Sequence, residues 1–480
     1  MSFMKRNNWK GIVLAGCVTL AVVIFSLVPA WADKLLNQIR PPAGEAALMR
    51  LSAPQAVRVA ITNNLRMTSM ALSLQQAQHE KNASYSDLFP QLSVEYLANV
   101  NRYQQPGNVA SLAGIHASRW LIRGNPNDST NQITNTYPYR IDPFKNFQLT
   151  ATLTQPLYAG GLLVNSYKNS ILAVHGSEQD FETAKEDLAL SVLKAYYQAV
   201  LGIKLLLVAE ESIRDLEAFK RRARAMYKAG EALKIDITAA EAHLSRARVQ
   251  RTKALTDLKT ARSSLNLLLG FPQNTPIDLE DNLRYQSADY RIPEIYNIAV
   301  MNRPEIRRAN ISTEQAKAQV KVAEAALMPS INLQVQGQRI NDDWNVIDPE
   351  GTNQWSLQGL FTWSFDFFRN RETVTKKRAA QAQSNVDKQY LIEQVIQQVH
   401  AAYLQVEHSK LDIPEVKKEV AFRQQQFALV KKMYNEQLAT YLNVVDAQTG
   451  LDRAKASHFG TLTDHLVNVA VLERQMGILR

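Results

Sequence analysis

Two related stretches decide the fold: AMYKAGEALKIDITAAEAHL at residues 225–244 and KMYNEQLATYLNVVDAQTGL at residues 432–451. Met226-Tyr227 of the first corresponds to Met433-Tyr434 of the second, an offset of 433 − 226 = 207 residues in a 480-residue chain. Each stretch interrupts a very long helical pattern, which is typical of a tight turn between two antiparallel helices. We therefore expect two helical hairpins, with the function at their turns.

The chain also repeats itself before the hairpins. Residues 51–89 and 290–328 share an unbroken helical pattern that stops at Pro90 and Pro329, and 329 − 90 = 239. Self-similarity of this kind indicates an internal duplication. The predicted divisions are a lead-in, a first repeat, a linker and a second repeat, at 33–50, 51–270, 271–289 and 290–480.

Each repeat then carries two stretches of alternating apolar and polar residues, at 92–101, 147–154, 331–338 and 354–365. This alternation predicts strands, and a length of about ten residues suits tilted strands that cross a bilayer. The polar faces hold mainly Gln and Thr, and the apolar faces carry Trp and Phe near strand ends. A soluble, half-buried sheet is the alternative. The extra residues between Tyr103 and Asn146 predict an exposed loop in the first strand pair.

Helical patterns of great length follow the strands. The first runs from Gly161 to about Tyr227, roughly 100 Å at 1.5 Å per residue. After the turn, a series of residues from Ile237 to Leu268, apolar except for Arg251, recurs at alternating steps of three and four, which indicates a coiled-coil seam. Pro414 lies deep inside the second long pattern, where proline costs roughly 3 kcal/mol, so a kink or short break is predicted there.

The amino terminus predicts export. Basic residues precede an uncharged apolar run at 11–28, and small residues at Ala30 and Ala32 favour cleavage after Ala32, so residues 1–32 form a signal peptide. The alternative is lipidation of Cys17, which would leave a short apolar region before it. Cys17 is the one cysteine of the chain, so the mature protein would have no disulfide, thiol catalyst or cysteine-bound metal.

Charge and hydropathy narrow the function classes. The 55 basic and 45 acidic residues are spread along helices and form no basic patch with aromatics, so nucleic acid is not an expected partner. No run after the signal approaches the ~20 apolar residues of a membrane helix. An exported membrane protein of this kind would have to contact lipid through its strands.

Four membrane strands cannot close a barrel alone. Open strand edges in lipid leave backbone groups unpaired at several kcal/mol each, and the smallest barrels need about 8 strands. A dimer would give a filled barrel with little lumen. Three chains are the smallest assembly with a channel, so we expect a homotrimer. Its fold would be mainly α, with a 12-stranded barrel, four strands from each chain, continued by a helical coiled-coil tunnel.

These features resemble the TolC-like outer-membrane channel-tunnel family. The resemblance covers nearly the whole mature chain and rests on LSAPQAVRVAITNN, DLFPQLSVE, TLTQPLYAGG, YKAGEALKIDITAAEA and YNEQLATYLNVVDAQ, which follow one another in this order. It implies a trimer in the cell outer membrane with a long periplasmic part. It also implies docking to a periplasmic adaptor and an inner-membrane pump.

The resemblance assigns a constriction to the second turn. The family pattern there places two acidic rings at the closed tunnel entrance. In this chain Asp446 keeps the inner acid, and Asn443 replaces the outer one. Three Asp446 carboxylates around one axis would attract cations and repel one another. The alternative is that Asp446 is a helix N-cap.

The resemblance also implies a latch between neighbouring helices. Asp236 and Tyr434 match the two family residues that tie the tips shut, whereas Ala439 stands where the family has a basic partner. The family's turn glycine is kept at Gly230, but Gln437 takes its place in the second copy. The strength of the resting closure is therefore left open.

No motif predicts an enzyme or a cofactor. The eight histidines follow no metal-binding spacing; His458 and His465 lie seven residues apart, and packing is favoured over a metal site. We expect a passive exit duct of an efflux or type I secretion system. The alternative is a non-conducting coiled-coil scaffold or adhesin of the envelope. The cargo could be a drug, a metal or a protein, because the pump would determine it.

Overall fold

The computed structural model describes residues 50–101, 144–230, 233–280, 283–285, 290–341, 344, 351–366 and 368–479. The predicted signal peptide, most of the lead-in and the long loop of the first strand pair lie outside these residues. The chain divides into two compact units. The sheet unit contains His79–Ile171 and Gln315–Ala382, and the helical unit contains the rest, including Leu172–Glu314 and Gln383–Arg480.

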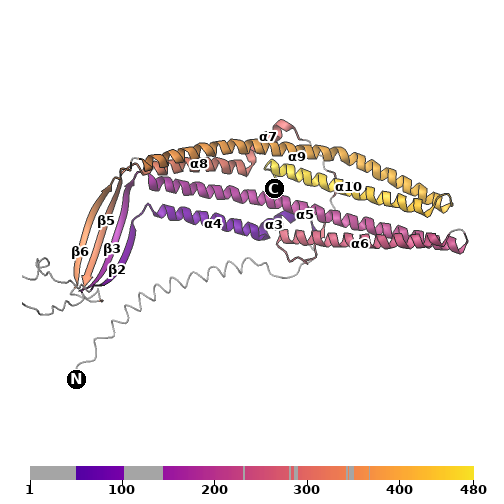
Figure 1. The fold of residues 1–480 in the computed structure, drawn as a ribbon, viewed down its shortest axis with the longest axis horizontal. Coiled ribbons are helices and arrows are strands. Elements are labelled where there is room, and N and C mark those ends of the chain that lie inside the picture. The colour runs from indigo at the N-terminus through magenta and orange to yellow at the C-terminus, as the bar shows by residue number, and fades with distance from the viewer. Residues whose placement is uncertain are drawn as a thin grey trace, which may run out of the picture. The chain divides into compact units, whose positions relative to one another are not determined.

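The same order of elements occurs twice along the chain (Figure 1). Two shorter helices precede two strands, and a pair of long helices follows. The first set is α3 Ala53–Asn63, α4 Leu65–Ser86, β2 Gln91–Asn101, β3 Phe144–Ala159, α5 Leu162–Lys228 and α6 Lys234–Leu269. The second set is α7 Ile292–Asn302, α8 Pro304–Ala325, β5 Ser330–Asn341, β6 Thr352–Thr362, α9 Arg369–Asn435 and α10 Tyr441–Gln475.

The sheet unit holds one antiparallel sheet in the order β2-β3-β5-β6. Leu92 lies opposite Leu153, and Val335 lies opposite Leu357, so like residues share a face across the strands. Many apolar side chains of this sheet are exposed, with Trp355 82% and Leu92 68% accessible. Among the described strands, β2 and β6 each pair on one side only, so both edges of this sheet are open in a single chain.

Each predicted unbroken helix before the strands is in fact two helices, so that prediction was wrong. The chain leaves the helix at Asn64 (ψ 127) and at Arg303 (ψ 124). At the second break, Pro304 disfavours helical geometry for the residue before it. At the first, the Asn64 carboxamide accepts from the Arg66 backbone N at 2.8 Å and donates to the Leu268 carbonyl at 2.8 Å, which stabilises the break.

The linker contributes to the core of the helical unit. A short parallel pairing joins β1 Arg50–Leu51 to β4 Asp278–Leu279. The buried Tyr196 hydroxyl of α5 lies 3.0 Å from the Leu51 carbonyl and 2.9 Å from the Glu280 carbonyl. The sequence pattern did not reveal this pairing, because strands of two residues carry no period.

The long helices agree with the predicted period. In α6 the seam residues Ala240, Leu244, Leu258 and Leu265 are buried. A Cβ placed on Gly202 of α5 would lie 3.2 Å from Leu258 Cδ1, so the two helices approach closely where Gly202 faces the seam residue Leu258. Helix α9 runs through Pro414 without interruption, so the predicted break is wrong. Proline cannot donate the hydrogen bond to the Lys410 carbonyl there, and the neighbouring Ile413 is buried.

One apolar stretch departs from expectation. Helix α5 contains an 18-residue window with a mean hydropathy of 1.5, which by length and composition alone is apolar enough to cross a membrane. No run of about 20 apolar residues in the sequence predicts such a helix. Within α5, Val192, Tyr196 and Val200 are buried in a core shared with α3 and α6, and 28% of the apolar window is buried in a single chain.

Candidate functional site at the hairpin turns

The two hairpin turns share an unusual backbone position. Gly230, between α5 and α6, has φ 81, and Gln437, between α9 and α10, has φ 63. The positions are 437 − 230 = 207 residues apart. Among the described residues, Gln437 is the one non-glycine with positive φ. A residue with a Cβ pays roughly 1–2 kcal/mol in this region, so the second turn is held by other contacts. These include the Leu438 N–H, which donates to the Met433 carbonyl at 2.8 Å.

A matching cap follows each turn. In α10, Asn443 Oδ1 accepts from the Thr440 backbone N at 3.0 Å, and Thr440 Oγ1 accepts from the Asn443 backbone N at 3.4 Å. In α6, Asp236 Oδ2 accepts from the Leu233 backbone N at 3.3 Å. These bonds satisfy N–H groups that a helix start leaves unpaired. Asn443, predicted to line the constriction, therefore also fixes the start of its helix.

An apolar cluster beside the turns packs the two hairpins together. It contains buried residues of α5, α6, α9 and α10, among them Phe219, Leu244, Phe427, Tyr434 and Tyr441. The Phe219 and Tyr434 rings are 6.3 Å apart, and the Tyr434 and Tyr441 rings are 6.4 Å apart. Edge-on aromatic contacts of this kind stabilise a cluster beyond the contribution of buried apolar area alone.

The predicted latch residues lie near each other without a hydrogen bond in one chain. Tyr434 is 5% exposed, and burial raises the pKa of its hydroxyl, as does the nearby charge of Asp236. The Asp236 carboxylate is engaged with the cap of α6, and no hydrogen bond from Tyr434 to it occurs among the described contacts. A latch between these two groups stays a prediction.

Asp446 lies inside α10 and is exposed. Thr440 is the N-cap of this helix, so Asp446 does not serve as one. In the other hairpin, His243 of α6 experiences the Asp446 charge: burial lowers the pKa of His243, Arg246 lowers it further, and Asp446 opposes both. Asp446 therefore lies close enough to His243 of α6 to influence it, a proximity that the sequence pattern does not reveal.

Polar contacts beside the apolar cluster also join α5 to the second hairpin. Lys455 of α10 lies 2.7 Å from Glu211, and Lys431 of α9 lies 3.9 Å from Asp215. The Lys431 ammonium is also 5.7 Å from the ring centre of Phe219 on α5. Sequence reasoning missed these ties. The spacing of Glu211 and Asp215 on one helix face was the available signal.

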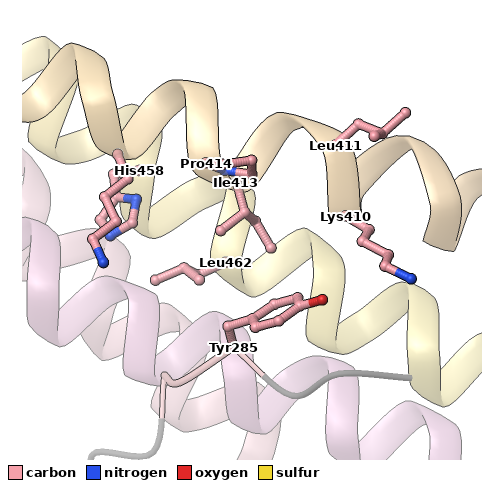
Figure 2. A pocket seen from close by; sticks show the side chains of 8 residues that line it. Tyr285, Lys410, Leu411, Ile413, Pro414, His458 and Leu462 are labelled. Carbon is pink, nitrogen blue, oxygen red and sulfur yellow. The ribbon is translucent and has the colours of Figure 1, made fainter. Parts of the chain in front are cut away.

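A groove of about 580 Å³ lies further along α9 and α10 (Figure 2). Pro414 and Ile413 of α9 line it, together with His458 of α10 and Tyr285 of the linker. Nearby, His465 is fully buried and bonded to Ser409 at 2.9 Å. For His465 this agrees with the packing interpretation of the histidines. No group of three potential ligands for a metal occurs within the described ranges.

Comparisons with known proteins agree with this architecture. The chain is 23% identical over 415 residues to the pyoverdine export outer membrane protein OpmQ of Pseudomonas putida, covering 84% of this chain and 80% of that protein. It is 22% identical over 429 residues to the probable efflux pump outer membrane protein TtgC of the same species, covering 88% and 82%. The solved structure of CusC has a TM-score of 0.72 at 19% identity, covering 92% of this chain and 97% of that one.

A sequence profile covers both halves. The family described as "Outer membrane efflux protein" matches residues 56–271 and 295–477, which include the helices, the strands and both hairpin turns. The fold of this chain is also similar to that of the CmeC outer membrane channel of Campylobacter jejuni. The TM-score is 0.69 at 15% identity, over 88% of this chain and 85% of that one. The chain belongs to the outer membrane efflux protein family.

Proposed function

We propose that this protein is a passive exit duct in the outer membrane, assembled as a homotrimer. Three chains would supply twelve strands to one barrel, and the long hairpins would form the tunnel in the periplasm. The observation that carries the proposal is the four-stranded sheet with two open edges and exposed apolar residues such as Trp355 and Leu357. In lipid, such edges must be paired with other strands, and a closed ring of copies does so.

The hairpin turns are the proposed gate. Asp446 is exposed on α10, and its repetition by symmetry would place three carboxylates around the axis at the tunnel entrance. Asn443 would add uncharged oxygens to the same constriction. Tyr434 and Asp236 would hold neighbouring helices closed, and the turn residues Gly230 and Gln437 would set the direction of each hairpin.

The gate would open when partners dock. We propose a periplasmic adaptor and an inner-membrane pump as these partners, with the energy supplied by the pump. Apolar side chains near the turns suit such a contact: Leu233 is 70% exposed and Leu438 is 69% exposed. The relatives named above are described as export and efflux proteins, which supports a transport role for this chain. Efflux of small molecules and type I secretion are both compatible with a passive duct.

The competing function is a non-conducting envelope scaffold or adhesin. Ion conductance in planar bilayers distinguishes it from a duct. We expect discrete conductance steps that increase when the turns are loosened by Tyr434→Phe. Protein that inserts into the bilayer, retains its sheet and helices, and yields no conductance in either form would favour the scaffold.

A further inference from the structure

A buried charge cluster joins helices from both repeats. Arg474, near the end of α10, is 5% exposed in its side chain. Its Nη2 lies 2.7 Å from Glu305 Oε1 of α8 and 2.8 Å from Asp187 Oδ1 of α5. Its Nη1 lies 3.2 Å from Glu186 Oε2, also of α5. The guanidinium therefore connects the first long helix to two helices of the second repeat.

A second guanidinium occupies the same cluster. Arg303, whose side chain is 7% exposed, donates to Glu305 at 3.2 and 3.1 Å in a paired arrangement. It also donates to Gln398 of α9 at 2.8 Å. Glu305 is thus held by both arginines, and Arg303 brings α9 into the network.

The cluster contains two cations and three carboxylates, so one carboxylate lacks full compensation. Asp187 is 46% exposed and can remain hydrated. Glu186 is only 12% exposed. Glu186 Oε2 and Arg474 Nη1 lie 3.2 Å apart and are both buried, and within the described part of the chain neither atom forms a hydrogen bond. Glu186 is therefore the member whose negative charge is least well accommodated, and a proton would remove that charge.

The pKa values of the two largely buried carboxylates, Glu186 and Glu305, are shifted in opposite directions, which agrees with this difference in compensation. Burial raises the pKa of Glu186 to about 7; Arg474 and Arg303 oppose this, whereas Glu305 and Asp187 reinforce it. Burial also acts on Glu305, but hydrogen bonds from Arg303 and Arg474 outweigh it and lower the pKa of Glu305 to about 2. Glu305 thus stays ionised beside Arg474, whereas the same arginine compensates the charge of Glu186 only poorly.

We propose that Glu186 is a proton-binding site of the folded protein, and that its proton strengthens the packing of α5 against α8 and α10. The charged groups that face Glu186 are Arg474, Arg303, Glu305 and Asp187, so protonation changes the cluster from a net negative charge to neutrality. The joint between the two repeats is then firmest at mildly acidic pH. This inference does not depend on the proposed duct.

The sign of the pH dependence follows by linkage. Between pH 4.5, the ordinary pKa of the group, and about 7, the folded protein holds the Glu186 proton while the unfolded chain has released it. The free energy of unfolding contributed by Glu186 therefore falls as pH rises through this window. The contribution of Glu305 has the opposite sign, since it is lost as pH falls from 4.5 toward 2.

The test is infrared spectroscopy of the full-length protein in detergent between pH 5 and 8. A protonated carboxylic acid has a carbonyl stretch that a carboxylate lacks. We expect this band to decrease with a midpoint near pH 7, and Glu186→Gln to lose that component. Asp187→Asn, in the same cluster but more exposed, is the comparison variant: it should keep the band, but with a midpoint at lower pH, because the Asp187 charge raises the pKa of Glu186. Burial raises the pKa of Glu473 and Asp452 as well, so the difference between wild type and Glu186→Gln is the quantity that counts.

Thermal melting provides the second readout. The wild-type Tm should fall from pH 5 to pH 8. This fall should shrink in Glu186→Gln, whereas in Asp187→Asn it should remain and begin at lower pH. A Glu186→Gln protein with a lower Tm than wild type at pH 8 would show that an ionised Glu186 stabilises the fold through Arg474, and would overturn the proposal. Should the variant fail to fold, a wild-type infrared spectrum without change from pH 5 to 8 has the same consequence.

Discussion

Asp236 and Asn443 occupy the same place in the two hairpins. Each is the third residue of the helix after a turn, and each side-chain oxygen accepts from the backbone N of the residue before that helix, at 3.3 Å for Asp236 and 3.0 Å for Asn443. They are 443 − 236 = 207 residues apart. The same cap thus carries a charge in one repeat and none in the other, so charge at this position can be varied with little change of the cap.

Charge at the second cap is predicted to alter ion selectivity. Asn443→Asp retains an oxygen for the Thr440 N–H and adds one carboxylate per chain beside Asp446. We expect stronger cation selectivity and tighter block by trivalent cations, and loss of both in Asp446→Asn. Coulomb attraction is roughly 4 kcal/mol at 4 Å with an effective dielectric near 20, which is enough for such block. Reversal potentials measure the effect. Identical values in wild type and Asp446→Asn would refute the acidic ring.

Loosening the latch is predicted to raise single-channel conductance. Tyr434→Phe removes the hydroxyl but keeps the buried ring, and Asp236→Ala removes the carboxylate. The matched control is Tyr227→Phe, because Tyr227 is the equivalent residue of the first repeat and is 45% exposed. We expect a rise in the first two variants and none in the control. If all three match wild type, other contacts hold the turns closed.

Lys431 is predicted to contribute to the same closure. It approaches Asp215 at 3.9 Å and the Phe219 and Phe427 rings at 5.7 and 5.8 Å. An exposed ion pair and a cation–π contact are each worth up to about 1 kcal/mol. Lys431→Met should therefore increase the open fraction up to several-fold, whereas Lys432→Met, the exposed neighbouring residue, should not. Equal open fractions in the two variants would show that Lys431 does not contribute to the closure.

The left-handed backbone at Gln437 gives a stability prediction. Gln437→Gly relieves the steric cost of φ 63, and Gly230→Ala introduces such a cost at φ 81. We expect the first change to stabilise the second hairpin by about 1 kcal/mol and the second change to destabilise the first hairpin by about 1–2 kcal/mol. Thermal melting of the full protein measures both. A lower Tm for Gln437→Gly would show that the glutamine side chain makes contacts which outweigh the strain.

The long elements were predicted well from the sequence, because their hydrophobic periods repeat over many residues. The predicted helix from Gly161 to about Tyr227 corresponds to α5, Leu162–Lys228, and the alternating stretches correspond to the four strands. Short-range features were missed. The break at Asn64 depends on a hydrogen bond to Leu268, and the β1–β4 pairing depends on Tyr196, so both arise from residues that are distant in the sequence.

The candidate site was predictable only in part. Repetition and resemblance located both turns, and the positive φ at Gly230 and Gln437 occurs at the expected positions. Neither could show that Asn443 caps a helix, that Tyr434 is buried among rings, or that Lys431 spans two helices. Those properties depend on which faces of α5, α9 and α10 meet.

The most direct test of the account is the mass of the detergent-extracted protein, measured by light scattering with the detergent contribution subtracted. The open edges at β2 and β6 require other strands in lipid, and three chains are the fewest that would close a barrel with a lumen. We predict a mass of three chains that persists on dilution. A stable monomer with intact sheet content would contradict the barrel, and with it the exit duct.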